Sequence, residues 1–326
     1  MNKTSNLIGV CGFLASVSVQ ALAQGTYPNQ PIRFVVTTAA GGALDSFART
    51  VAKELTLRAG HQVLVDNRPG AGTTIGSATV AKAKPDGYTI LVNTAAFAIS
   101  PAIYQKLPYD TLADFAPITL GVSAPNLMVV HPSMPVKSVR DLLNLAKARA
   151  GKGDGILYAS GGTGTNGHLA TALFQSMAQI HMTHVPYKAG SLALVDVMSG
   201  QVPIMLDTVS VVLSHVNAGK LRALGVSSLQ RAAAAPAIPT IAESGLPGYE
   251  SLQWFGLLAP AGTPTEILAW LHRENTGLLR ASSMKEKLAA EGLDVVANSS
   301  EEFAALIRSD IAKWTKLVKA IDIPLM

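Results

Sequence analysis

Apolar runs and amphipathic stretches alternate along most of the chain. The runs IRFVVTT and YTILVNT are continuous and short, which is typical of buried strands. Between them, apolar residues recur at helical spacing from Ala43 until Gly60, where a helix is expected to end. The pattern predicts strands at 32–38, 61–67 and 88–94, with helices from residue 43 and within 70–83. This βαβαβ order implies a parallel sheet with helices on its faces.

A second unit of the same kind begins after Asp114, with two strands, APITLGVS and NLMVVHP, expected on either side of Pro125. Strands are predicted at 156–160, 181–187, 202–208 and 221–228, alternating with helices at 166–179, 191–199 and 209–218. The Pro-, Ala- and Gly-rich segment 230–265 is expected to be an ordered connection. Capping sequences at Thr263 and Ser299 predict two further helices, the second with an apolar stripe facing a core. The expected fold class is α/β, with two Rossmann-like lobes and a ligand cleft between them.

The predicted lobe boundaries are 24–124 together with 228–326 for lobe 1, and 125–227 for lobe 2. Residues 1–23 are expected to be a signal peptide: Lys3 precedes an apolar stretch, and Ala21-Leu22-Ala23 is a small-x-small cleavage site. The alternative, a membrane anchor, is disfavoured because the apolar stretch is shorter than the roughly 20 residues a bilayer requires. We therefore expect a periplasmic protein cleaved after Ala23. Cys11 is the only cysteine, so no disulfide is expected.

Charge and motifs exclude several classes of function. A formal charge of +5, spread without basic runs, gives no sign of nucleic-acid binding. The chain contains neither G-x-S-x-G nor H-E-x-x-H. His181 and His184 would face opposite sides of a strand, which disfavours a shared metal. We expect a monomer that is not an enzyme and that has no metal and no cofactor.

Two loops that join a strand to a helix contain mostly small residues. In the first, TTAAGGALD (37–45), unpaired backbone N–H groups at the positive end of a helix would form an anion site. The alternative is a tight turn in which the glycines only satisfy backbone geometry. The second, SGGTGTNGH (160–168), follows the same pattern, and its N–H groups are likewise expected to be free.

The second loop also matches the dinucleotide pattern G-x-G-x-x-G at Gly162, Gly164 and Gly167. A dinucleotide site would need an acidic residue at the end of the next strand, about 20 residues later. The first acidic residue there is Asp196, inside the following helix. An anion site is therefore favoured over a nicotinamide-dependent oxidoreductase. His168 is expected to pack or hydrogen-bond at the helix start. Asn93 and Asp207 lie at the ends of two other strands and are further candidate ligand contacts, although a helix cap is the favoured alternative for Asp207.

Thirteen segments in order along the chain resemble one family: the tripartite tricarboxylate transporter substrate-binding proteins, or Bug family. Among them are YPNQPIRFVV, AAGGALD, VDNRPGAGTTIG, AKPDGYTILV, YASGGTGTNGHLA, HVPYKAG, GQVPIMLD and WFGLLAPAGTP. The resemblance implies a periplasmic binding protein that closes over a small carboxylate and delivers it to a permease of a large and a small subunit. It implies ligand contacts, many through main-chain amides and water, at Ala40, Gly41, Gly42, Ala43, Asp45, Ser160, Gly162, Thr163, Gly164, Thr165 and Asp207.

The first loop departs from the family pattern, in which a hydroxyl residue precedes the Asp. Here Ala43-Leu44 precedes Asp45, and Leu44 is large and apolar. We therefore expect a ligand with an apolar portion, such as an aromatic or long-chain carboxylate. An extracytoplasmic sensor that presents its ligand to a signalling receptor is the alternative function, because it would use the same cleft.

Overall fold

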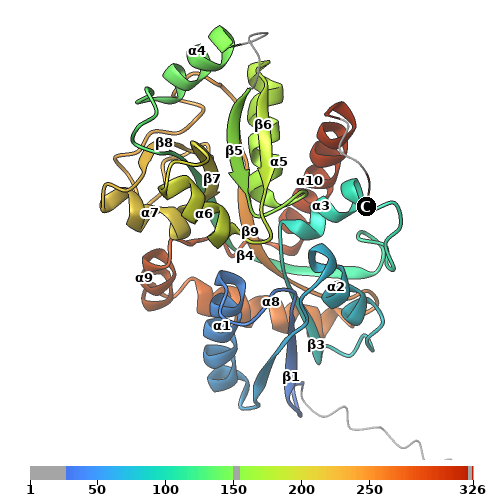
Figure 1. Ribbon diagram of the computed structural model, residues 1–326. Coiled ribbons are helices and arrows are strands. Elements are labelled where there is room, and N and C mark those ends of the chain that lie inside the picture. Colours follow the sequence, from blue (N-terminus) through green and yellow to red (C-terminus); the bar gives the residue numbers. More distant parts are fainter. Residues whose placement is uncertain (1–26, 150–154, 322–324, 326) are drawn as a thin grey trace, which may run out of the picture.

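Two lobes joined by long strands form the molecule (Figure 1). The computed structural model describes residues 27–149, 155–321 and 325, so the predicted signal peptide lies outside the described residues. The predicted two-lobed α/β fold is confirmed. Within the described ranges, no helix combines the length and apolar character needed to cross a membrane.

Lobe 1 is built on a sheet with strand order β2-β1-β3-β9-β4, in which β1 pairs in parallel with β2 and β3, and β9 runs antiparallel to β3 and β4. Its elements are β1 (Ile32–Val36), α1 (Ala43–Ala59), β2 (Val63–Asn67), η1 (Ala71–Thr73), α2 (Thr74–Ala81), β3 (Thr89–Thr94), α3 (Ala96–Ile103), the first part of β4 (Phe115–Val130), β9 (Leu252–Pro260), α8 (Thr265–Leu279), α9 (Ser282–Ala290), β10 (Asp294–Val295) and α10 (Ser300–Ala320).

Lobe 2 continues the sheet as β4-β7-β5-β6, with β7, β5 and β6 parallel and β4 antiparallel to both β7 and β8. Its elements are the second part of β4, α4 (Val139–Arg149), β5 (Ile156–Ser160), α5 (Asn166–Ala178), β6 (Met182–Pro186), α6 (Gly190–Met198), β7 (Ile204–Thr208), α7 (Val209–Asn217) and β8 (Arg222–Val226). These bounds confirm the alternating strands and helices that the sequence predicted here.

Strand β4 corrects the prediction of two separate strands around Pro125. It is one strand of 16 residues that passes from one lobe into the other. Residues up to Pro125 pair with β9, whereas Asn126–Val130 pair with β7 and β8. The missing N–H of Pro125 falls where the strand exchanges partners, so the proline does not interrupt either ladder.

Strand β9 lies within 230–265, where the sequence predicted an ordered connection and no strand was identified. Its residues Trp254–Pro260 are all buried between β3 and β4. A strand buried on both faces shows no alternation of apolar and polar residues, and the Pro- and Gly-rich sequence on both sides of it obscured the apolar run.

The segment 228–250 packs against lobe 2, although the predicted boundary assigned it to lobe 1. Ile241, Leu246 and Tyr249 belong to the buried cluster formed with α4 and α5, and the Tyr249 hydroxyl donates to Ala170 O at 2.9 Å. We therefore propose that the chain returns to lobe 1 near Ser251 instead of at residue 228.

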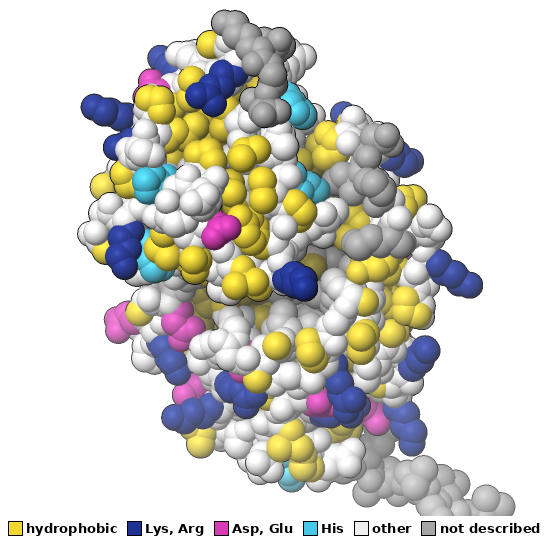
Figure 2. Space-filling view, in the orientation of Figure 1, with side chains coloured by type: hydrophobic (Ala, Val, Ile, Leu, Met, Phe, Trp, Pro, Cys, Tyr) yellow, Lys and Arg dark blue, Asp and Glu magenta, His cyan; other side chains and the backbone are white. Residues whose placement is uncertain are grey.

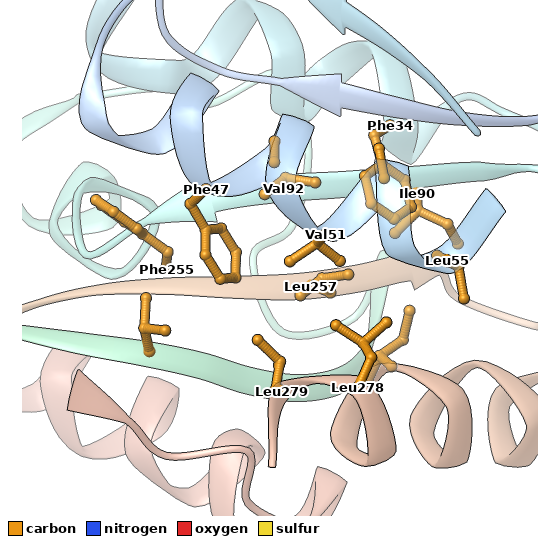
Figure 3. Close-up of a cluster of buried hydrophobic side chains, with 14 of the residues drawn as sticks. Phe34, Phe47, Val51, Leu55, Ile90, Val92, Phe255, Leu257, Leu278 and Leu279 are labelled. Atoms are coloured by element: carbon orange, nitrogen blue, oxygen red, sulfur yellow. The ribbon is translucent and has the colours of Figure 1, made fainter. Parts of the chain in front are cut away.

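The core of lobe 1 explains the helical spacing of α1. Phe47, Val51 and Leu55 point from α1 toward the sheet (Figure 3). In the same cluster are Phe34, Ile90, Val92, Phe255 and Leu257 from the sheet and Leu278 and Leu279 from α8 (Figure 3). Gly60 ends the helix in the left-handed conformation, with φ of 67°.

Helix α10 connects the lobes on the side opposite α1 (Figure 1). The apolar stripe expected on this helix is buried, which confirms the prediction: Phe303 and Ile307 pack on lobe 1. Farther along the helix, Trp314 packs with Ile103 of α3 and Leu169 of α5 in one cluster. The C-terminal half of α10 therefore contacts both lobes.

Removal of the α10 cap should have a measurable effect. Ser299 Oγ accepts from Glu302 N–H at 3.1 Å, and Glu302 Oε2 accepts from Ser299 N–H at 2.9 Å. Ser299→Ala is expected to lower the free energy of unfolding by about 1 kcal/mol in urea denaturation. Ser282→Ala is the matched control because Ser282 begins α9, which has no side-chain cap. Equal stabilities of the two variants would contradict the capping role.

Candidate functional site

Asp45 fixes the shape of the β1–α1 loop. Its side chain is buried (3 % exposed). Oδ2 accepts from Gly41 N–H at 2.8 Å and from Arg49 Nε at 3.0 Å, and Oδ1 accepts from Asn67 Nδ2 at 2.9 Å. Burial by itself would raise the pKa of this carboxyl, but the hydrogen bonds from Arg49, Gly41 and Asn67 outweigh it and lower the pKa. The carboxylate is therefore engaged with the loop and with α1, and it orders the residues that precede it.

Leu44 does not face the cleft, which corrects the basis of the expected ligand preference. Its side chain is 2 % exposed and belongs to the core of lobe 1. The exposed residues of the loop are instead Ala39, Ala40, Gly41, Gly42 and Ala43. Since Leu44 adds no apolar surface to the cleft, it gives no reason to expect an apolar ligand.

The start of α1 lies on the side of lobe 1 that faces lobe 2. Gly42 has no side chain to cap α1, so among the described residues the helix start keeps N–H groups for a ligand. Ser46 in that turn donates to Glu291 at 3.0 Å, and the adjacent Gly292 packs against Ser210 at the start of α7. The start of α1 in lobe 1 and the start of α7 in lobe 2 therefore border the same space between the lobes.

The β5–α5 loop uses part of its backbone internally. Gly162 N–H donates to Ser160 Oγ, and Gly164 N–H donates to His168 Nδ1, each at 3.1 Å. Thr165 caps α5 and also donates to Gly162 O at 2.8 Å. The Gly162 and Gly164 N–H groups are therefore already used within the loop, and a contact of these two residues with a ligand stays a prediction.

A cavity of about 220 Å³ lies beside this loop, in the region that is hollowed between the lobes in Figure 2. It is lined by Asn126, Gly161, Thr165, Asn166, Gly167, Gly190, Leu206, Asp207, Thr208 and Gln253. The starts of α5 and α6 meet here, and amide and hydroxyl side chains complete the wall. Asp207 is the one ionisable side chain among these lining residues.

The predicted site residues are divided between this cavity and its surroundings. Thr165 and Asp207 line the cavity, and Thr163 is in the loop beside it. Ser160 is buried beneath, with its Oγ 2.7 Å from His184 Nε2. Asn93 is fully buried and bonds to Thr37 and Ser77, so it supports the β3 end without facing the cleft. The residues 40–43 belong to lobe 1 and do not line this cavity.

Only Thr165 and Asp207 of the ten lining residues were predicted contacts, and eight were missed: Asn126, Gly161, Asn166, Gly167, Gly190, Leu206, Thr208 and Gln253. Gly190 follows a strand and begins a helix, so the pattern used for the other two loops could have identified it. Asn126 lies in β4 and Gln253 in β9, where these strands pass between the lobes. No local sequence pattern identifies either residue as part of a site. Gln253 Oε1 accepts from Ala95 N–H at 3.3 Å, which connects the cavity to the β3–α3 turn of lobe 1.

The Asp207 carboxyl can act as donor or acceptor. Loss of hydration raises its pKa. Hydrogen bonds from the backbone N–H and the hydroxyl of Thr208 offset part of this rise, and the backbone N–H lies 2.7 Å from Asp207 Oδ1. In its protonated form it can donate to a ligand carboxylate, and in its ionised form it can accept from a hydroxyl or ammonium group. Among the described residues, no group of three or more His, Cys, Asp or Glu side chains is arranged to hold a metal ion.

Comparison with known proteins places this geometry in a family. The sequence model of the tripartite tricarboxylate transporter family receptor matches residues 47–323. BugT of Bordetella pertussis is 33% identical over 322 residues, covering 98% of each chain. The solved structure of R. palustris Rpa4515 with adipate is 34% identical, with a TM-score of 0.81, and covers 92% of this chain and 100% of that one.

A second solved structure, MatC (Rpa3494) from Rhodopseudomonas palustris with bound malate, is 28% identical, with a TM-score of 0.76. It covers 90% of this chain and 100% of that chain. Together with the resemblance of motifs along the sequence, these matches show that the chain belongs to the tripartite tricarboxylate transporter receptor family, with BugT among its relatives.

Proposed function

We propose that this protein captures a small carboxylate between its lobes in the periplasm and delivers it to a tripartite tricarboxylate-type permease. The relatives solved with adipate and with malate support a carboxylate as the ligand. The N-terminal sequence, with Lys3, an apolar stretch and Ala21-Leu22-Ala23, supports export and cleavage after Ala23.

The observation that carries the proposal is the cavity where the starts of α5 and α6 converge, with no basic side chain among the described residues that line it. An anion there is stabilised by backbone N–H groups at helix starts, by side-chain N–H groups of Asn166 and Gln253, and by water. The side-chain N–H groups of Asn126 instead donate to Asn166 Oδ1 and Ser251 O and hold the wall of the cavity in place. Gly41, Gly42 and Ala43 present a second helix start from lobe 1. Closure of the lobes brings both sets of N–H groups to one ligand, and this difference between the open and closed states favours closure.

Ligand-induced stabilisation tests the proposal. The chain from residue 24 onward, unfolded and refolded to remove any copurified ligand, is titrated with adipate, malate, benzoate and, as an uncharged control, adipamide. At a ligand concentration 100 times Kd, we expect about 2.7 kcal/mol of stabilisation and a higher Tm. Adipamide should give no shift. A shift with adipamide but not with any carboxylate would refute anion recognition.

Delivery to a permease has its own test. A strain that lacks this chain should lose uptake of the radiolabelled carboxylate identified in the titration, and the full-length chain should restore it. Unchanged uptake together with loss of a transcriptional response to that carboxylate would instead support the sensor function.

A further inference from the structure

Two histidines stack behind the β5–α5 loop. His168, on the first turn of α5, is 6 % exposed, and its ring lies nearly parallel to that of His184 on β6, with 4.0 Å between centroids. The ring of Tyr158 on β5 also lies close to that of His184, with 4.9 Å between centroids and 22° between the ring planes. Three rings from three elements therefore lie directly beneath the loop.

Each histidine is hydrogen-bonded to the loop. Gly164 N–H donates to His168 Nδ1 at 3.1 Å. A neutral imidazole has one acceptor nitrogen and one N–H, so the proton of His168 must be on Nε2. His184 Nε2 lies 2.7 Å from Ser160 Oγ, which in turn accepts from Gly162 N–H at 3.1 Å. The two rings thus fix the two backbone amides that the loop turns away from the ligand.

We propose that His168, supported by His184, is a positioning residue for ligand binding. By holding the Gly164 amide inward, it sets the path of the loop and directs the free N–H groups of Thr163, Asn166 and Gly167 toward the cleft. The inference rests on the proposed function, because the ligand is the carboxylate that those N–H groups would meet.

Only the neutral imidazole can have this role, since a protonated Nδ1 would place one donor against another. Burial, together with repulsion from His184 in the case of His168, lowers the pKa of both histidines to about 4. Tyr158 and His184 face the His168 ring, and a cavity of about 470 Å³ adjoins it on the side of Gln175, Gln179 and His181. Among the described residues that line this cavity there is no carboxylate to favour a charged ring.

The first test requires no ligand. The ¹⁵N shifts of the His168 ring in the protein from residue 24 onward should show the Nε2–H tautomer and no titration between pH 7.5 and pH 5. The Gly164 amide should exchange with solvent more slowly than that of Thr163. An Nδ1–H tautomer, or titration near pH 6.5, would overturn the proposal whether or not a carboxylate binds.

The second test compares substitutions with adipate as the probe. His168→Asn keeps an acceptor at the position of Nδ1, whereas His168→Leu removes it. We expect His168→Leu to weaken adipate binding about tenfold and to speed Gly164 exchange, and His168→Asn to stay within about threefold of the unsubstituted protein. His181→Asn is the matched control, because His181 lines the same cavity without contacting the loop, and it should leave binding unchanged.

The pH profile separates positioning from packing. The ratio of adipate affinities for the unsubstituted protein and His168→Asn should stay constant from pH 7.5 to about 5.5 and fall toward pH 4, because adipate ionisation affects both equally. A folded His168→Leu that binds adipate as tightly as the unsubstituted protein would refute the proposal. If His168→Leu does not fold, His168→Asn and the ring shifts decide. If no carboxylate binds the unsubstituted protein, the proposed function fails, while the ring shifts still test the role of His168 in the loop.

Discussion

Gly167→Ala is expected to destabilise the protein by about 2 kcal/mol and to weaken carboxylate binding at least tenfold. A Cβ on Gly167 would lie 2.6 Å from Leu206 O, a backbone atom of β7 that no side-chain rotation can move. Alanine gains about 1 kcal/mol of helix propensity over glycine, whereas forcing extra volume into a packed site costs about 1–3 kcal/mol or more. The steric term therefore prevails, and separation of α5 from β7 would widen the cavity that both elements line.

Gly42→Ala provides the matched control from the other lobe. Gly42 also lies at a helix start beside the cleft, as the N-cap of α1. Its φ of −85° is accessible to alanine, and a Cβ added there would meet no atom closer than Ala39 O at 3.7 Å. Its free energy of unfolding should change by less than about 0.5 kcal/mol. Urea denaturation and adipate calorimetry measure both effects. If Gly167→Ala is as stable as Gly42→Ala, the packing of α5 on β7 is looser than the described contact requires.

Asp45→Ala is the second substitution with a large expected effect. It removes the carboxylate that accepts from Gly41 N–H and Asn67 Nδ2, and a hydrogen bond to a charged group contributes about 1.5–3 kcal/mol. Both bonds are only partly buried, so water replaces part of this contribution. Arg49 is half exposed and regains water, which limits the loss from the ion pair. We expect about 2–3 kcal/mol of destabilisation and at least a tenfold loss of adipate affinity, because the exposed loop residues lose their fixed arrangement.

The effect of Asp45 should depend on pH in a defined direction. The pKa of this carboxyl is lowered from 3.8 in the folded state, so its stabilising contribution is complete well above pH 3.8 and is lost as the pH falls through the lowered pKa. The stability difference between the unsubstituted protein and Asp45→Ala should therefore shrink below pH 3.8. Asp66→Ala is the control, because Asp66 pairs with Arg33 and Arg68 at the surface, where such pairs contribute at most about 1 kcal/mol. Equal effects of the two substitutions would contradict the role of Asp45 in the loop.

The sequence alone determined the local elements of this protein. The spacing of Phe47, Val51 and Leu55 predicted α1, Gly60 marked its end, and Ser299 with Glu302 marked the start of α10. These features can be predicted from the sequence because the residues that contact one another are only three or four positions apart. Their spacing along the chain is therefore enough to identify the contact. The alternation of such elements was enough to predict two α/β lobes, and motifs along the chain were enough to predict the family.

Only the tertiary structure decided how these elements combine around the cleft. Pro125 interrupts the apolar pattern of the sequence, yet β4 continues through it, and the Pro- and Gly-rich sequence around β9 masks the pattern of that strand. Neither strand can be recognised locally, because the residues that pair are more than 100 positions apart, as in Ser123 with Trp254. The directions of Leu44 and of the Gly164 amide were also decided there, the first by the core of lobe 1 and the second by His168. A run of small residues allows a backbone to approach a ligand, but the side chains packed behind the loop determine which N–H groups reach it.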